Sequence, residues 1–278
     1  MTNFLALSVC KIRDSGKIEY NKNQSTEATF QIYNAMAEIV IHSAETFIQE
    51  DFEIVVFEDE VDSYQEIFHK NFQNVYDLWQ EEGPNNIFYL DCDTLITRPL
   101  EIFGKYDRFQ LFNYTDPKRL QGPDAGNKYG LQHEHYFNAG VRYYPSTMTP
   151  ELWDLGWSYA NDWDYDIWGT EQVIFNEMMY CQDRDVNTWL DPTMNYQAMG
   201  LTPQGLEDSN HLNALNRWNG CEINDAKVMH LHGTRGAGNT LLTQWAIWKK
   251  ITGEEFDFTN LAVEQDQKIT GLRLVPKN

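Results

Sequence analysis

The chain has 278 residues, enough for one large α/β domain or two small ones. Hydrophobic residues make up 42% of it and aromatic residues 14%, which supports a packed core and excludes a largely disordered protein. Because 42 acidic residues outnumber 21 basic ones, the net charge is −21, and we expect neither nucleic acid nor an anionic membrane as a partner.

The cysteines and the N-terminus give no sign of a zinc site, a signal peptide or a membrane span. None of the four cysteines lies in a Cys-x-x-Cys pair. The apolar run at 4–9 is short, and no basic segment precedes it as in a signal peptide. No span approaches the roughly 18 apolar residues of a membrane helix. We therefore expect a cytoplasmic protein.

Apolar runs of strand length alternate with segments of helical periodicity in the first part of the chain. In chain order, the predicted elements are a strand at 4–9, a helix at 29–49, a strand at 52–57, a helix at 63–81, and strands at 87–90 and 108–113. Such alternation favours a parallel, doubly wound sheet, in which ligands bind beyond the carboxyl ends of the strands.

The second part of the chain begins with a polar segment at 114–132, which is expected to be a long surface loop. The elements predicted after it are a strand at 140–144, helices at 150–161 and 170–180, a strand at 227–231 and a last amphipathic helix around 241–251. No repeat or linker divides the chain. We expect one domain over 1–252 and an acidic tail over 253–278.

The segment 86–96 ends an apolar strand on two carboxylates, Asp91 and Asp93, with Cys92 between them. Alternate side chains of a strand share a face, so we expect the carboxylates to converge and Cys92 to be a packed thiol on the opposite layer. Paired carboxylates at a strand end suit Mg²⁺ or Mn²⁺, which bind together with substrate phosphates. Such a cation would offset the negative field that otherwise repels a nucleotide diphosphate.

Four segments, in order, resemble the motifs of one enzyme family. Residues 89–94 (Tyr-Leu-Asp-Cys-Asp-Thr) resemble the DxD motif of the GT-A nucleotide-sugar glycosyltransferases, in the form seen in family 8, the glycogenin and galactosyltransferase group. Residues 137–141 (Phe-Asn-Ala-Gly-Val), 169–172 (Gly-Thr-Glu-Gln, with Asn176 following) and 228–233 (Val-Met-His-Leu-His-Gly) resemble three further segments. The resemblance implies a GT-A α/β fold with a doubly wound, mainly parallel sheet flanked by helices.

The resemblance also implies that Asp91 and Asp93 ligate a metal ion bridging the diphosphate of the donor. His230 is the expected third ligand, because His-Leu-His-Gly fits the family's H-x-x-G with His230 first. His232 is the rival ligand, since alternate strand residues face the same way. An ordinary strand-end hydrogen bond is the alternative for His230. Imidazole suits Mn²⁺ better than Mg²⁺, so Mn²⁺ is the expected cofactor and Mg²⁺ the alternative.

Four residues are expected to contact the nucleotide of the donor. Ser8 and Lys11 follow the first strand, where the family holds the base and ribose; a surface position is the alternative for Lys11. Gly233 would let the backbone approach the phosphates. Arg235 is the expected cation for the leaving diphosphate, with an exposed turn arginine as its alternative. The turn lacks the Gly-Lys-Ser/Thr ending of a P-loop, which argues against an ATPase.

Three residues are the catalytic candidates by the same resemblance. Asn138 would donate a hydrogen bond to the donor sugar or the acceptor, unless it only satisfies a local turn. Glu171 and Gln172 open a helix, where an acidic residue is also a good first-turn choice. Glu171 is the candidate for orienting the sugar or assisting proton transfer. Asn195 resembles a family residue on the acceptor side.

One position departs from the family pattern. A lysine is common on the second helix, about one turn before Trp79, and Val75 stands there instead. Lys70 lies too far along the helix to be a sure replacement. The usual contacts to the donor, and the identity of the sugar, are therefore open.

Two further groups suit sugar or metal chemistry by composition. His133 and His135 would share a face of a strand, where a second metal site and contact with the acceptor are alternatives to a plain surface. Tryptophans between the middle motifs suit an acceptor platform, although core packing is expected for most of them. They are Trp153, Trp157, Trp163 and Trp168.

Together these residues predict a metal-dependent hexosyltransferase. It would move a hexose from a nucleotide diphosphate sugar, expected to be a UDP-sugar, to a hydroxyl of a glycan or small molecule. The resemblance implies retention of the anomeric configuration. An inverting enzyme would need a base opposite the leaving group, for which Glu171 or His135 could serve.

Two other functions compete with this prediction. A sugar-1-phosphate nucleotidyltransferase would need a glycine-rich, basic loop after the first strand, and residues 8–13 lack its glycines. A non-catalytic carbohydrate-binding relic of the fold is the other, and the intact Asp91, Asp93 and His230 argue against it.

Overall fold

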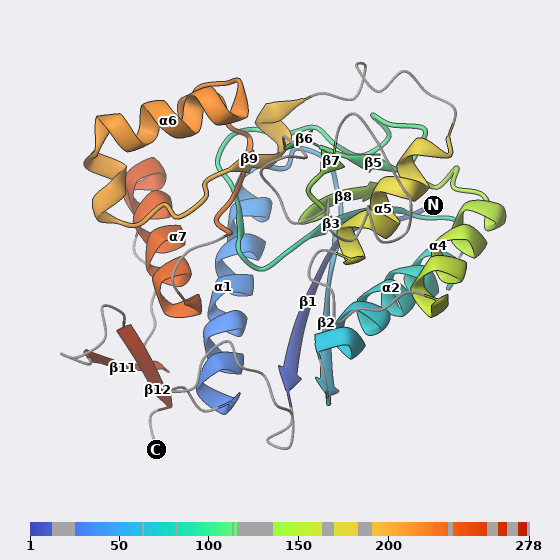
Figure 1. The fold of residues 1–278 in the computed structure, drawn as a ribbon, viewed down its shortest axis with the longest axis horizontal. Helices are drawn as coiled ribbons and strands as arrows, with labels where there is room; N and C mark the ends of the chain where they lie inside the picture. The colour runs from blue at the N-terminus through green and yellow to red at the C-terminus, as the bar shows by residue number, and fades with distance from the viewer. Residues whose placement is uncertain are drawn as a thin grey trace.

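The computed structural model describes residues 1–12, 26–62, 64–81, 83–112, 114–115, 136–162, 170–182, 191–232, 236–254, 261–265 and 272–276. Its centre is a five-stranded mixed sheet in the order β2-β1-β3-β8-β5 (Figure 1). These strands are β1 (Asn3–Ile12), β2 (Glu53–Val61), β3 (Asn86–Leu90), β5 (Gln110–Leu111) and β8 (Val141–Tyr144). Strand β1 pairs in parallel with β2 and β3, and β8 pairs antiparallel with β3 and β5.

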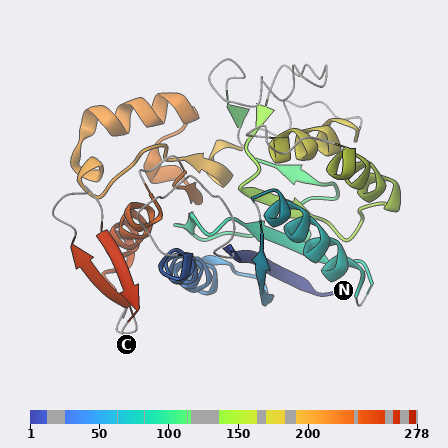
Figure 2. The same cartoon turned by 60° about the horizontal axis from the view of Figure 1, so that its bottom comes forward.

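Helices cover both faces of this sheet (Figure 2). Helices α1 (Thr26–Phe47) and α7 (Ala237–Thr252) pack on one face. Helices α2 (Tyr64–Gln80), α4 (Pro150–Asp162) and α5 (Thr170–Tyr180) pack on the other. The predicted α/β fold class, a sheet between two layers of helices, is confirmed.

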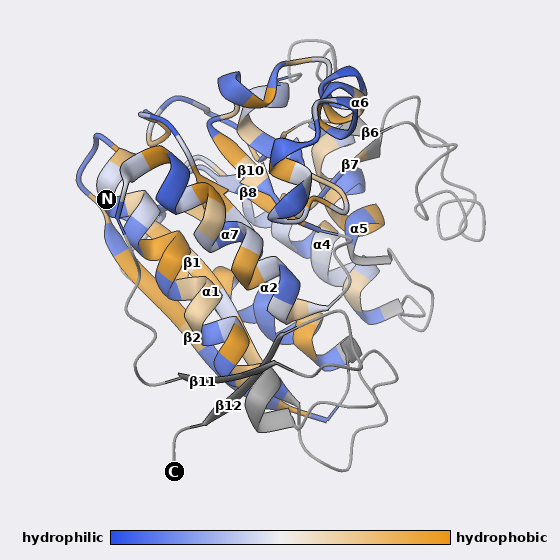
Figure 3. Ribbon diagram, turned by 90° about the vertical axis from the view of Figure 1, so that its left-hand side faces the viewer, coloured by the Kyte–Doolittle hydropathy of each residue, from blue (hydrophilic) through white to orange (hydrophobic). Residues whose placement is uncertain are grey.

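Strand β1 shows why its sequence is almost continuously apolar. Leu5, Leu7 and Val9 belong to the core formed with α1 and α7, whereas Phe4 and Ala6 belong to the core formed with α2, α4 and α5. A strand buried on both faces has no polar face to present, so its residues do not alternate in polarity. The apolar colouring along β1 in Figure 3 follows from this position.

A second, three-stranded sheet lies at the carboxyl end of β3. It has the order β4-β10-β9, with β4 at Thr94–Ile96, β10 at Val228–His230 and β9 at Tyr196–Gln197. Strand β10 is antiparallel to β4, and His230 pairs with Thr94. The pairing brings the predicted late motif against the predicted DxD motif, although the two are far apart in the sequence.

Several elements differ from the sequence prediction. Strand β2 runs to Val61, four residues beyond the expected end, and the strand expected at 108–113 is only the two residues of β5. Strand β8 runs antiparallel to both of its neighbours, β3 and β5, and makes the sheet mixed, a reversal that composition does not reveal. Strands β4 and β9 and helix α6 (Ser209–Asn219) were not predicted.

The short elements complete the described chain. Strands β6 (Tyr114–Thr115) and β7 (Tyr136–Phe137) pair with each other, and most of the loop expected at 114–132 lies outside the described residues. The 3-10 helices are η3 (Pro192–Asn195), η4 (Gln204–Glu207) and η5 (Ile223–Asp225). None of the helices in the described part of the chain has the length and apolarity needed to cross a membrane.

The segment expected as an acidic tail contains a β-hairpin. Strands β11 (Leu261–Gln265) and β12 (Leu272–Pro276) pair antiparallel with each other. The hairpin lies beside α1 and α7 (Figures 1 and 2). The division between a domain at 1–252 and a tail at 253–278 stays a prediction.

Candidate active site

The two predicted carboxylates lie in a tight turn rather than in a strand. Strand β3 ends at Leu90, and the backbone N–H and the hydroxyl of Thr94 both donate to the carbonyl of Asp91, at 3.1 and 2.8 Å. The expected reason for their convergence, alternation along a continuing strand, is therefore wrong. The turn brings the carboxylates together instead. The predicted packing of Cys92 is confirmed, since its buried thiol donates to the carbonyl of Ser8 at 3.1 Å.

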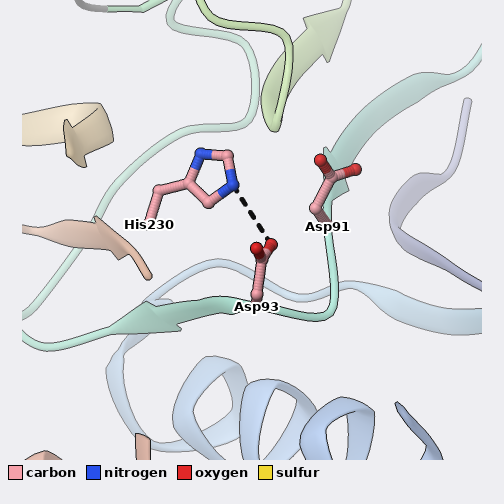
Figure 4. Close-up of side chains that lie close together, drawn as sticks. All are labelled: Asp91, Asp93 and His230. Atoms are coloured by element: carbon pink, nitrogen blue, oxygen red, sulfur yellow. Dashed lines mark ion pairs between the residues drawn. The ribbon is translucent and has the colours of Figure 1, made fainter. Parts of the chain in front are cut away.

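His230 faces this turn from the neighbouring strand β10. Its Nε2 lies 3.1 Å from Oδ1 of Asp93 (Figure 4). One ligand atom each from Asp91, Asp93 and His230 lie within 4.8 Å of one another. The backbone supports the arrangement, because the N–H of Leu231 donates to the carbonyl of Asp93 at 2.8 Å. The structure thus brings together the three residues predicted as metal ligands.

Gly140 makes room for the imidazole of His230. A Cβ at this position would lie 2.1 Å from Cε1 and 2.6 Å from Nδ1 of the ring, so no larger residue fits without displacing it. The carbonyl of Gly140 also accepts from the backbone N–H of Asp91 at 2.9 Å. The glycine of the Phe-Asn-Ala-Gly-Val segment therefore contacts two of the other predicted motifs, the Asp-x-Asp segment and the segment with His230.

The three side chains fit a divalent cation. Two ligands on opposite sides of a small cation are about 4.2 Å apart, since each metal–oxygen bond is about 2.1 Å, so only a small closure of the cluster is needed. Two carboxylates and one imidazole form a donor set that suits Mn²⁺. Asp91 is 41% exposed and Asp93 27% exposed, while His230 is buried, so the cluster opens to solvent on the carboxylate side.

The charges in the cluster determine its protonation. Burial acts to lower the pKa of His230, but the charge of Asp93, the hydrogen bond to Asp93 and the charge of Asp91 outweigh it and raise that pKa. Burial acts to raise the pKa of Asp93, but His230 outweighs it and lowers that pKa. The ion-free protein therefore holds a proton on His230 more tightly than a free imidazole would, and a metal ion would compete with that proton.

His232 lies beside His230 in a different environment. The ring centroids are 4.7 Å apart, and Nε2 of His232 lies 3.2 Å from Oε1 of Gln197. Burial and the neighbouring His230 lower the pKa of His232 to about 3, so it is neutral near pH 7. The metal-ligand geometry includes His230 and not His232, and it favours His230 over its rival.

Arg142 on β8 is a charged group of the site that the sequence analysis missed. It is buried, with its guanidinium 3.8 Å from the ring centroid of Tyr89 and 4.4 Å from that of Phe175. Its Nη2 lies 3.7 Å from Oδ1 of Asp91. Burial acts to lower its pKa, but nearby tyrosines and Asp91 outweigh burial and raise it. The sequence could have indicated this residue, because Arg142 is the one charged residue in the apolar strand that begins after Gly140.

The predicted asparagines are buried and form hydrogen bonds around the segment between β7 and β8. Oδ1 of Asn138 accepts from the N–H of Gly140 at 2.8 Å, and Nδ2 of Asn195 lies 3.3 Å from the same oxygen. Asn176 on α5 accepts from the N–H of Phe137 at 2.7 Å and donates to its carbonyl at 2.8 Å. These contacts hold the Asn138 segment in place. Contacts of Asn138 and Asn195 with a sugar stay predictions.

The other catalytic candidates lie at the start of α5. Gln172 is partly exposed, and no donor in the described part of the chain reaches its buried Oε1. The side chain of Glu171 lies outside the described residues. The roles of both toward the sugar stay predictions.

Two of the four predicted nucleotide contacts can be placed. Ser8 lies on β1 next to the turn, and its carbonyl contacts Cys92. Lys11 lies three residues further along β1, with its Nζ 3.9 Å from Glu60 and 5.8 Å from the ring centroid of Phe30. Gly233 and Arg235 lie outside the described residues, as do His133 and His135.

Val75 and two of the four tryptophans lie in the hydrophobic core or pack against it. Val75 is buried on α2, in the core that also contains Tyr89 and Phe175. Trp153 is fully buried and stacks on Tyr144, and Trp157 packs edge-on against Phe72, as expected of core residues. Trp163 and Trp168 lie outside the described residues.

Comparison with solved structures identifies the fold. A glycosyltransferase involved in the glycosylation of the major capsid of PBCV-1 is similar over 88% of this chain and 98% of its own, with a TM-score of 0.51 and 11% sequence identity. The chain has a glycosyltransferase fold. This confirms the predicted GT-A-type α/β architecture, and at this level of identity the similarity concerns the fold alone.

Two further solved structures are similar at lower TM-scores. The galactosyltransferase LgtC, in complex with donor and acceptor sugar analogues, gives 0.49 at 15% identity over 91% of this chain and 96% of its own. The bifunctional glycosyltransferase WbbM gives 0.48 at 12% identity over 90% of this chain and 51% of its own. No protein-family model matches the sequence, and comparison with curated protein sequences finds no match.

Proposed function

We propose that this protein is a metal-dependent glycosyltransferase that moves a hexose from a UDP-sugar to a hydroxyl acceptor, with retention of configuration. The observation that supports it is the convergence of Asp91, Asp93 and His230 at the carboxyl end of β3, within a glycosyltransferase fold. In α/β sheets, ligands bind beyond the carboxyl ends of the strands. The cluster therefore lies where a nucleotide sugar would bind.

Asp91, Asp93 and His230 would hold the metal ion, with Mn²⁺ as the expected ion. Bound there, the ion neutralises the charge that develops on the leaving diphosphate. The protein's part is to fix these ligands. The turn after β3 orients the carboxylates, and β10 and Gly140 fix the imidazole. A cation at this point also makes an anionic donor compatible with a net charge of −21.

Residues around the cluster would orient the sugars. Asn138 would donate to the donor sugar or the acceptor, and Glu171 and Gln172 at the start of α5 would face the reacting carbon. Arg235, with Gly233, would contact the leaving diphosphate, and Ser8 and Lys11 the base and ribose. These assignments come from the family resemblance.

The decisive test is UDP release from a panel of UDP-sugars, with Mn²⁺ and with EDTA. We expect slow hydrolysis of one donor by the wild type, lost with EDTA and reduced at least 100-fold in Asp93→Asn, because that variant keeps the size of the side chain and removes a ligand charge. Asp154→Asn is the matched control, since Asp154 is exposed on α4 away from the cluster. It should hydrolyse the donor like the wild type.

The products distinguish the competing functions. Manganese-dependent release of UDP that Asp93→Asn does not change would contradict the proposal. Consumption of a sugar-1-phosphate together with a nucleoside triphosphate, with release of pyrophosphate and formation of a nucleotide sugar, would indicate a nucleotidyltransferase. If no UDP-sugar is turned over and calorimetry still detects manganese-dependent binding of UDP, the protein is a binding relic of the fold.

A further inference from the structure

Burying the charge of Arg142 costs free energy. Its side chain is 6% exposed, and no acceptor among the described residues reaches its buried Nε. Removing a guanidinium from water costs free energy that good hydrogen bonds must offset. The distance of 3.7 Å to Asp91 is an ion pair and too long for a hydrogen bond. The contacts that hold the charge are therefore with the two rings beside it and with Asp91 of the cluster.

The surroundings of Arg142 keep it charged and fixed. The guanidinium lies against the rings of both Tyr89 and Phe175, and cations are attracted to aromatic faces. Tyr89 is its cross-strand partner in the β3–β8 pair. The position of the guanidinium is therefore fixed, and it lies on the buried side of the partly exposed Asp91 carboxylate. Water does not screen a charge there as it would at the surface.

The charge of Arg142 changes what the cluster binds. Asp91 and Asp93 carry two negative charges, and Arg142 cancels one of them. A free divalent cation that binds there leaves an excess positive charge in a partly buried site, and Arg142 repels it. A nucleoside diphosphate removes that excess. Arg142 thus opposes the free cation and favours the cation with its diphosphate.

We infer that Arg142 couples metal binding to nucleotide binding: it weakens the site for a free divalent cation and strengthens it for a cation that carries a nucleoside diphosphate. This inference rests on the proposed metal and nucleotide site. Arg142 acts through its charge, which lies 3.7 Å from Asp91, and it is neither a metal ligand nor a catalytic residue. The consequence is that the metal enters with the donor and leaves with the nucleoside diphosphate.

The test is calorimetric titration of the full chain with Mn²⁺ at one fixed pH, without nucleotide and with saturating UDP. In Arg142→Met an unbranched side chain still packs against the two rings, but the charge is gone. We expect this variant to bind Mn²⁺ alone roughly ten-fold more tightly than the wild type. The factor by which UDP tightens Mn²⁺ binding should fall by a similar amount, because the coupling is reciprocal.

Three other variants control the experiment. Arg142→Gln removes the same charge and must shift Mn²⁺ affinity in the same direction, which protects the test if Arg142→Met unfolds. Arg142→Lys keeps the charge and should resemble the wild type. Arg217→Met removes a charge from the exposed face of α6 and should change neither affinity.

The outcomes separate this inference from the proposed function. If Arg142→Met and Arg142→Gln bind Mn²⁺ alone no more tightly than the wild type, Arg142 has only a structural role and the inference is overturned. If the wild type binds Mn²⁺ neither alone nor with UDP, the proposed function fails and the inference with it.

Discussion

His230 and Gly140 depend on each other, although 90 positions separate them in the sequence. The imidazole lies against the α-carbon of Gly140, where any side chain would overlap it. This glycine has no positive φ to explain it, and close approach of the ring is the physical reason for its place. Histidine and glycine therefore act as one unit of the metal cluster.

Replacing Gly140 by alanine should damage the metal site more than the fold. A Cβ 2.1 Å from Cε1 must displace the ring of His230, so we expect the Mn²⁺ affinity of Gly140→Ala, measured by calorimetry, to fall at least ten-fold. The free energy of unfolding should fall by about 1–3 kcal/mol, as for other overpacked sites.

Gly156→Ala is the matched control for this substitution. Its Cβ would lie 2.5 Å from Cζ of Phe72 and 2.8 Å from Sδ of Met178, within the core beside α2 and α5. It should destabilise the protein comparably and leave Mn²⁺ affinity unchanged. An equal loss of affinity in both variants would mean that the effect is general destabilisation.

Helix α7 holds the turn that carries the two carboxylates. Its fully buried Gln244 donates through Nε2 to the carbonyl of Cys92 at 2.9 Å and also to the carbonyl of Thr94. The two carbonyls flank Asp93. A helix from the end of the chain thus sets the backbone of a turn near residue 92, which no local pattern in the sequence reveals.

Gln244→Leu should loosen this turn. Two buried carbonyls lose their donor, so we expect a loss of about 2–4 kcal/mol in the free energy of unfolding, measured with urea. Mn²⁺ affinity should fall with it, because the carboxylates are no longer held close. Thr243→Val is the neighbouring control, since its hydroxyl contacts Leu201 and Asn239 away from the turn. Unchanged Mn²⁺ affinity in Gln244→Leu would show that the turn holds its own shape.

At the scale of the whole molecule, the stability of the metal-free protein and the stabilisation that a metal ion adds should change with pH in opposite directions. The folded-state pKa of His230 is raised above its ordinary value of 6.5, so the stability it contributes is present below pH 6.5 and is lost as pH rises through the folded-state pKa. The pKa of Asp93 is lowered below 3.8, so its contribution is lost only in acid, as pH falls through that pKa. His232 lowers the free energy of unfolding only below its ordinary pKa of 6.5, because its folded-state pKa is about 3 and the folded protein resists its protonation.

In EDTA, we therefore expect the free energy of unfolding to fall as pH rises from 6.5 toward 8, and His230→Gln to flatten that slope. A metal ion needs a neutral imidazole, so the rise in melting temperature caused by Mn²⁺ should grow over the same range. Urea unfolding and thermal melts at matched ionic strength measure the two trends. A wild-type slope that persists in His230→Gln would assign it to another group.

The sequence by itself determined the elements whose pattern is strong. Apolar runs and helical periodicity placed β1, α1, α2, β3, α4, α5 and α7 close to their observed positions. The Asp-x-Asp pair and the late segment with His230 supplied the three metal-ligand candidates. These features are local, since a strand buried on both faces or an amphipathic helix carries its pattern in adjacent residues.

Only the tertiary structure decided how these elements meet. The antiparallel direction of β8, the pairing of β10 with β4 and the place of Arg142 behind Asp91 depend on contacts between residues far apart in the chain. The carboxylates converge through a turn held by α7 and not through strand alternation. A lone arginine in an apolar strand shows no partner in the sequence, because its partners lie on β3 and α5. Burial and distance assign its role, and the folded chain alone determines both.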